Sequence, residues 1–200
     1  MIPKVIFRYS RVYDSNYRNS KKIKKILDER NEGYPSYEKI ISYIEEVKNI
    51  WEKEGEKILS EISNIINLKW KEKEIICYVI GYGRGLSDPL TVRLYENKND
   101  FIDTLIHELI HQIQIQNSKK WKKWADKFLK KDYKEETQLT KSHILLHAIH
   151  WQIFIRLFNK KRLDRNIKYS QKFPDYKQSW EVVKKEGYKN IINNFKKINN

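Results

Sequence analysis

Residues 101 to 116 read FIDTLIHELIHQIQIQ and have the pattern of an amphipathic helix. Apolar side chains recur in this stretch every three or four positions, which is the spacing of one helix face. The stretch also holds His107, Glu108 and His111 in an H-E-x-x-H spacing. Residues four apart lie one turn above the other on the same face. His107 and His111 can therefore offer two imidazoles to one metal ion.

Glu108 is the third residue of this motif. We expect its carboxylate to lie close to the open coordination position, where it can take a proton from metal-bound water rather than bind the metal. The alternative is a pair of histidines packed on a polar helix face with no metal. The spacing and the helical context are two separate agreements, and together they favour the metal site.

The other three histidines all lie in a second helical stretch, SHILLHAIHWQIFIRLF at residues 142–158. This stretch is apolar on nearly all sides, which is typical of a helix at the centre of a fold. His143, His147 and His150 follow one stripe of it. Burial of three imidazoles is costly unless each has a hydrogen-bond partner or a metal, so the stripe calls for one or the other.

A hydrolytic zinc site takes three protein ligands and leaves the fourth position for water. We predict that His143 is the third ligand, because it opens the second helix and could meet the motif helix near its ligand face. His147 is the next candidate, followed by Glu135 or Glu136. A histidine that does not bind the metal could orient a ligand or stabilise an oxyanion. His150 fits a structural role best.

A small sheet and a long helix are predicted for the first half of the chain. Strand patterns occur three times, at residues 3–8, 74–80 and 90–95. Ser36 is a plausible cap for a long amphipathic helix that reaches residue 66, and Gly55 could bend or split it. If the strand at residues 90–95 lies at the sheet edge, it could hold an extended peptide by strand addition.

Two more amphipathic helices are predicted after the motif. Residues 117–131 carry an aromatic stripe among lysines, made of Trp121, Trp124 and Phe128. A stripe of this kind usually packs on a core, and contact with a membrane surface or nucleic acid is the alternative. Residues 176–198 are predicted to form one closing helix, whose apolar face is interrupted by Gly187.

The composition fits a folded, soluble protein. Hydrophobic residues make up 40% of the 200 positions and charged residues 34%, and no apolar run approaches the ~20 residues that span a bilayer. We expect one domain over residues 1–200, in three parts: residues 1–70, 71–158 and 159–200. The single cysteine, Cys77, excludes an internal disulfide and fits the cytoplasm. Its strand context favours an inert core residue over a metal ligand.

The formal net charge is +15, from 41 basic and 26 acidic residues. Because lysines occur along the whole chain, the excess looks dispersed. It favours nonspecific attraction to polyanions, including nucleic acid, without indicating a specific partner.

The HELIH motif at residues 107–111 resembles the active-site helix of the zincin metallopeptidases, and the strand before it resembles the zincin edge strand. The resemblance covers about residues 74–158. It implies an α+β, predominantly helical, zincin-like fold in which a small sheet lies over two central helices. The long N-terminal helix would support this core and a C-terminal helix would close it. The resemblance also implies that His107 and His111 bind zinc and that Glu108 is the catalytic acid and base.

The subgroup of zincins is not assigned. Metzincins continue the motif with a glycine and a third histidine, and Gln114 and Asn117 stand at those positions here, which excludes that subgroup. Gluzincins take a glutamate from a downstream helix, a role that Glu135 or Glu136 could fill. A distant third histidine and a basic charge are similar to SprT-like DNA-associated proteases, although the residues that follow the motif in that group are not recognisable.

These observations predict a zinc-dependent hydrolase that cleaves peptides or proteins, with one Zn²⁺ held by His107, His111 and His143 and with Glu108 as general base. The alternative is a basic nucleic-acid-binding protein with a structural zinc. Such a site would be closed by a fourth protein ligand, for example His147, and would leave no water to activate.

Overall fold

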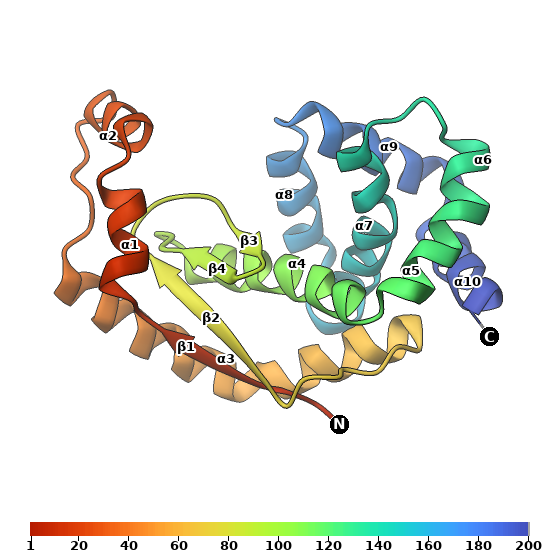
Figure 1. Ribbon diagram of the computed structural model, residues 1–200, viewed down its shortest axis with the longest axis horizontal. Coiled ribbons are helices and arrows are strands. Elements are labelled where there is room, and N and C mark those ends of the chain that lie inside the picture. Colours follow the sequence, from red (N-terminus) through yellow and green to blue (C-terminus); the bar gives the residue numbers. More distant parts are fainter. Residues whose placement is uncertain (200) are drawn as a thin grey trace. The chain divides into compact units, whose positions relative to one another are not determined.

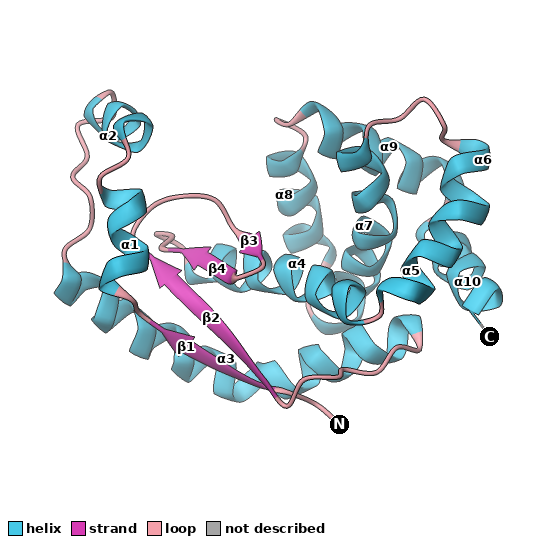
Figure 2. Ribbon diagram, in the orientation of Figure 1, coloured by secondary structure: helices cyan, strands magenta, loops and turns pink. Residues whose placement is uncertain are grey.

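The computed structural model describes residues 1–199 and has an α+β fold that is mostly helical, as the sequence predicts (Figure 2). The chain divides into two compact units. Unit 1 consists of Met1–Lys57 and Glu72–Gln112. Unit 2 consists of Ile58–Lys71 and the residues from 113 onward.

Unit 1 contains a four-stranded mixed sheet with the order β1-β2-β4-β3 (Figure 1). Three strands run parallel to one another: β1 (Lys4–Arg8), β2 (Glu74–Ile80) and β4 (Leu90–Arg93). The fourth strand, β3 (Leu86–Ser87), is antiparallel to β4. The three predicted strands are confirmed, and β3 is an additional strand between the second and third of them.

The position of β4 in the sheet differs from the prediction of an edge strand. Leu86 of β3 pairs with Thr91, and Ser87 pairs with Leu90. Since β2 lies on the other side of β4, β4 has a neighbour on both sides. The edge on this side of the sheet is therefore β3, and the condition for strand addition at residues 90–95 is not met.

Two long helices pack on one face of this sheet. They are α3 (Tyr37–Ile66) and α4 (Lys98–Gln116), which carries the H-E-x-x-H motif. The ring of Phe7 on β1 lies 6.3 Å from that of Trp51 on α3 and 5.9 Å from that of Phe101 on α4. One strand residue thus contacts both helices, which places the motif helix against the sheet.

The long helix α3 is continuous. It follows Ser36, whose hydroxyl accepts a hydrogen bond from the backbone N–H of Lys39 at 3.2 Å, as expected of a cap. Gly55 neither ends nor splits it. A Cβ at Gly55 would lie 2.4 Å from the indole of Trp51, so this glycine makes room for the tryptophan of the preceding turn.

Two short helices, α1 (Arg11–Arg18) and α2 (Lys21–Asp28), lie between β1 and α3 in the chain. The carboxylate of Asp14 on α1 is fully buried and accepts hydrogen bonds from four groups: the hydroxyls of Tyr9 and Tyr34, the guanidinium of Arg18 and the backbone N–H of Gly81. Asp14 therefore ties α1 to the start of the loop that follows β2.

Unit 2 is built from helices that surround α7, the helix with three histidines. Its elements after α4 are α5 (Ser118–Trp124), the π-helical turn η1 (Ala125–Leu129), α6 (Lys130–Asp132), α7 (Gln138–Leu157), α8 (Lys160–Ser170), α9 (Pro174–Glu186) and α10 (Tyr188–Asn199). The large side chains that are fully buried in it are Trp124, Phe154, Trp180 and Phe195. The apolar helix predicted at residues 142–158 is confirmed as α7.

The other helices of unit 2 differ from prediction in three ways. The helix predicted at residues 117–131 contains the π-helical turn η1. The closing helix predicted at residues 176–198 is two helices, because Gly187 has a φ of 81° and ends α9. The third difference is α8, which was not predicted because its sequence is mostly charged and has few apolar positions.

Within residues 1–199, no helix is both long and apolar enough to cross a membrane. Cys77 is fully buried on β2, in agreement with its predicted place in the core.

Candidate metal centre

The two histidines of the motif lie on the same side of α4. The rings of His107 and His111 are 5.1 Å apart and nearly perpendicular. Both side chains are half-buried. The helical spacing of four residues therefore places the two imidazoles side by side, as the sequence predicts.

Glu108 lies in a much less polar environment than an ordinary glutamate. It is 8% exposed, and burial raises the pKa of its carboxyl group to about 8. Burial raises the pKa of the Cys77 thiol on β2, and the negative charge of the Glu108 carboxylate raises it further. Glu108 thus faces the interior of unit 1, where water gives it little stabilisation in the charged form.

The loop between β2 and β4 lies directly against Glu108. A Cβ at Gly85 would lie 2.6 Å from Oε1 of Glu108 and 3.0 Å from Cγ2 of Thr104. Any side chain at residue 85 would therefore displace the carboxylate. The glycine permits the backbone to cover it.

Both ends of this loop are held in place. At its start, the N–H of Gly81 donates to Asp14 Oδ1 at 3.0 Å. Near its end, the side-chain amide of Gln112 donates to the carbonyl of Ser87 on β3. Since Gln112 follows His111 on α4, the edge strand and the motif helix are fixed to each other.

His143 is the best-oriented histidine of α7 for a metal. Its Nδ1 lies 2.8 Å from the carbonyl oxygen of Leu139. A carbonyl can only accept, so Nδ1 carries the proton and Nε2 keeps its lone pair, which is the arrangement common for metal-binding histidines. Burial lowers the pKa of His143 to about 4, which keeps the ring neutral. The ring of Tyr176 on α9 lies 4.4 Å away.

The other two histidines of α7 have different surroundings. Nδ1 of His147 lies 2.7 Å from the Ser179 hydroxyl on α9, and its ring stacks on Trp180 at 4.1 Å. His150 is fully buried, and burial lowers its pKa to about 3. The contacts of His147 with α9 fit a residue that joins two helices.

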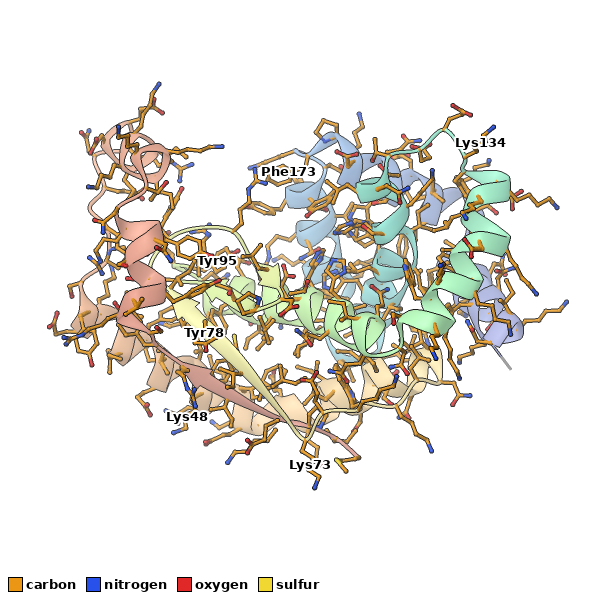
Figure 3. All side chains as sticks on the ribbon, viewed as in Figure 1. Lys48, Lys73, Tyr78, Tyr95, Lys134 and Phe173 are labelled. Atoms are coloured by element: carbon orange, nitrogen blue, oxygen red, sulfur yellow. The ribbon has the colours of Figure 1, made fainter. Side chains whose placement is uncertain are left out.

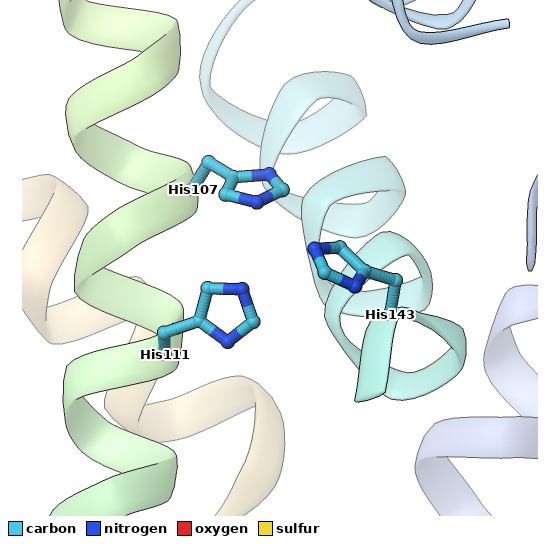
Figure 4. A group of neighbouring side chains, drawn as sticks. All are labelled: His107, His111 and His143. Atoms are coloured by element: carbon cyan, nitrogen blue, oxygen red, sulfur yellow. The ribbon is translucent and has the colours of Figure 1, made fainter. Parts of the chain in front are cut away.

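One nitrogen from each of His107, His111 and His143 lies within 4.8 Å of the others (Figure 4). Among residues 1–199 no other group of histidine, cysteine, aspartate or glutamate meets this criterion. The remaining candidate ligands, His147, Glu135 and Glu136, are outside the group, and Glu136 accepts a hydrogen bond from Gln178.

Two residues that shape the surroundings of the motif were missed from the sequence. A signal for Gly85 exists, since three glycines at alternate positions, 81, 83 and 85, precede the H-E-x-x-H motif. The role of Asp14 is not visible locally, because two of its four partners, Tyr34 and Gly81, come from distant parts of the chain.

Comparison with family models, with characterised proteins and with solved structures finds no match to this chain.

Proposed function

We propose that the protein is a zinc-dependent hydrolase that cleaves peptide bonds. The observation that carries this proposal is the arrangement on α4, where His107 and His111 lie side by side and a buried Glu108 lies between them in sequence. His143 is proposed as the third ligand because its nitrogen completes the group of three.

The donor set fits zinc. Three neutral imidazoles are a known ligand set for catalytic zinc, and three protein ligands leave a coordination position open. The low pKa of His143 and its Nδ1 hydrogen bond to Leu139 keep Nε2 in the form that binds a metal. Soft metal ions that prefer thiolate ligands are disfavoured, because Cys77 is not part of the group of three histidines.

When bound, zinc supplies a Lewis acid that lowers the pKa of water toward ~7 and polarises a carbonyl oxygen. Glu108 acts as the general base and then passes the proton to the leaving amine. Burial raises its pKa to about 8, so its carboxylate is a stronger base than that of an exposed glutamate. A zinc ion held by the neighbouring histidines would oppose this shift and favour the charged carboxylate.

The edge strand β3 suggests how a peptide could be held. Leu86 and Ser87 pair with β4 on one side only, so their other side can accept an extended chain by strand addition. Gln112 fixes Ser87 to the motif helix. A peptide added to β3 would therefore run beside the helix that carries Glu108. The strand proposed to bind the peptide is therefore β3 rather than β4. The resemblance to zincins is kept.

Zinc-dependent cleavage of an unfolded protein tests the proposal. Zinc-loaded protein should cut reduced, unfolded casein into peptides, a chelator should stop it, and added zinc should restore it. If the zinc-loaded protein cuts neither casein nor a mixed peptide library, the peptidase proposal is wrong.

Cobalt substitution separates a catalytic site from a closed structural one. An exchangeable water on the cobalt supports the hydrolase. Four protein nitrogens, with His147 as the fourth, would support a structural zinc. The hydrogen bond of His147 to Ser179 and its stacking on Trp180 favour the open site.

Gly85→Ala is expected to lower kcat while zinc affinity stays unchanged. The added methyl group would lie 2.6 Å from Oε1 of Glu108, and the flexible carboxylate would move to relieve the overlap. A displacement on the order of 1 Å at a catalytic group can cost ~100-fold in rate. Steady-state kinetics and zinc titration measure the two effects. Gly33→Ala is the matched control, because a Cβ at Gly33 meets nothing within 4 Å; equal losses in both variants would contradict the role given to Gly85.

A further inference from the structure

The positive charge of the protein belongs entirely to unit 2. Unit 1 contains 17 basic and 17 acidic residues, whereas unit 2 contains 24 basic and 9 acidic residues. The whole excess of +15 is therefore in the unit that contains α5 to α10. Nearly all of this excess lies in the single segment from residue 113 onward, which contains 22 basic and 8 acidic residues. A division of charge this sharp indicates a polyanionic partner for one unit.

Within unit 2, the largest cluster of lysines lies on α5, η1 and α6 and the turn that follows them. Residues 118–134 contain eight lysines and two aspartates. All eight lysines are exposed, and we refer to them as the lysine face. Lys134, marked in Figure 3, ends it in the turn after α6. Within the described part of the chain, Lys130 is the one member paired with an acidic side chain, Asp126 at 2.7 Å. Seven ammonium groups therefore remain to neutralise a partner's charge.

The apolar side of the same helices is already used inside unit 2. Trp124 is fully buried, stacks with Phe128 at 5.2 Å and donates from Nε1 to Asn194 on α10. Residues 118–134 include no exposed large hydrophobic side chain. A helix that binds a membrane surface inserts apolar side chains, and single-stranded nucleic acid stacks its bases on exposed aromatic rings. The lysine face has no exposed apolar side chain to insert and no exposed aromatic ring for stacking. This favours a partner that is contacted through charge alone.

We propose that the lysine face of α5–α6 binds the phosphate backbone of double-stranded DNA. The helical segment from Ser118 to Asp132 is about 22 Å long at ~1.5 Å per residue. Duplex DNA presents one phosphate per ~1.7 Å of its axis, so a segment of this length lies along enough phosphates for every lysine. Lysine contacts with phosphate carry no sequence information, so the binding is independent of DNA sequence.

A second basic stretch in α8 is less suited to this role. Residues 160–172 contain six basic residues and one aspartate. The guanidinium of Arg162 lies 3.9 Å above the ring of Phe158, so part of this charge is engaged within the fold. The lysine face is both larger and less engaged.

The chain provides a matched control for the test. The lysine face begins with the sequence KKWKK at residues 119–123, and α2 in unit 1 begins with KKIKK at residues 21–25. All four lysines of each group are exposed. Changing each group to glutamine removes the same charge from two helices with the same spacing. One variant is K119Q/K120Q/K122Q/K123Q and the control is K21Q/K22Q/K24Q/K25Q.

Binding of the zinc-loaded protein to a fluorescent DNA duplex is measured by anisotropy at several salt concentrations. The variant on α5 should bind at least ~10-fold more weakly in low salt, with a salt slope smaller by about 3 to 4, because each lost phosphate contact removes ~0.9 from it. The control on α2 should bind like the wild type.

Three results overturn the proposal. Equal weakening of both variants means that only total charge matters. Unchanged binding of the α5 variant means that another surface binds DNA. Stronger binding to an RNA duplex, or to vesicles rich in phosphatidylserine, than to the DNA duplex means that a different polyanion is the partner.

Discussion

Glu108→Gln protein should bind zinc like the wild type and lose about 10²- to 10⁴-fold in kcat, which is the range for removal of a general base. Glutamine keeps the size of the side chain and its place against Gly85, but its amide cannot take a proton. The proposed zinc ligands His107 and His111 are untouched. Zinc content after gel filtration and cleavage of unfolded casein measure the two properties on the same sample.

The matched control is Glu54→Gln, the same chemical change at an exposed position of α3. It should retain both zinc and activity. Two results contradict the role of Glu108. Full activity in pure Glu108→Gln protein would mean that another group moves the proton, and loss of zinc would mean that Glu108 is a ligand rather than a base.

Local sequence patterns predicted the elements that carry the motif. The apolar period of residues 101–116 predicts α4, and the helical spacing alone predicts that His107 and His111 lie side by side, as they do. The strand β2 has the predicted bounds. These features depend on residues within a few positions of one another, so a single sequence contains them.

Features that depend on distant residues could not be predicted. The short strand β3 forms only because β4 is beside it, and its two residues have no pattern of their own. Asp14 becomes important only when Gly81 and Tyr34 are brought to it. In each case the missing information is which segments meet.

The third metal ligand shows the same limit. His143, His147 and His150 lie on one stripe of α7, and sequence spacing does not distinguish among them. Their positions in the structure do. Nδ1 of His143 donates to Leu139 of the same helix, whereas Nδ1 of His147 contacts Ser179 on α9. Only His143 has a nitrogen near those of His107 and His111.

His143→Ala should therefore weaken zinc binding by more than ~100-fold, since loss of an outer-shell partner already costs roughly 10- to 100-fold. His147→Ala and His150→Ala remove the same side chain from the same helix. Each should weaken zinc binding by no more than ~100-fold. Competition with a chromophoric chelator on metal-free protein gives the affinities.

All three substitutions remove a buried ring from α7, so each costs stability, and urea unfolding of the metal-free proteins must accompany the titrations. A variant that stays folded but loses zinc has lost a ligand. If folded His147→Ala loses zinc and folded His143→Ala keeps it, then His147 is the third ligand and the proposed set is wrong. If all three folded variants keep zinc, the third ligand lies outside α7. The proposal requires the loss in His143→Ala alone, because only this ring offers Nε2 to the pair on α4 while its Nδ1 is held by its own helix.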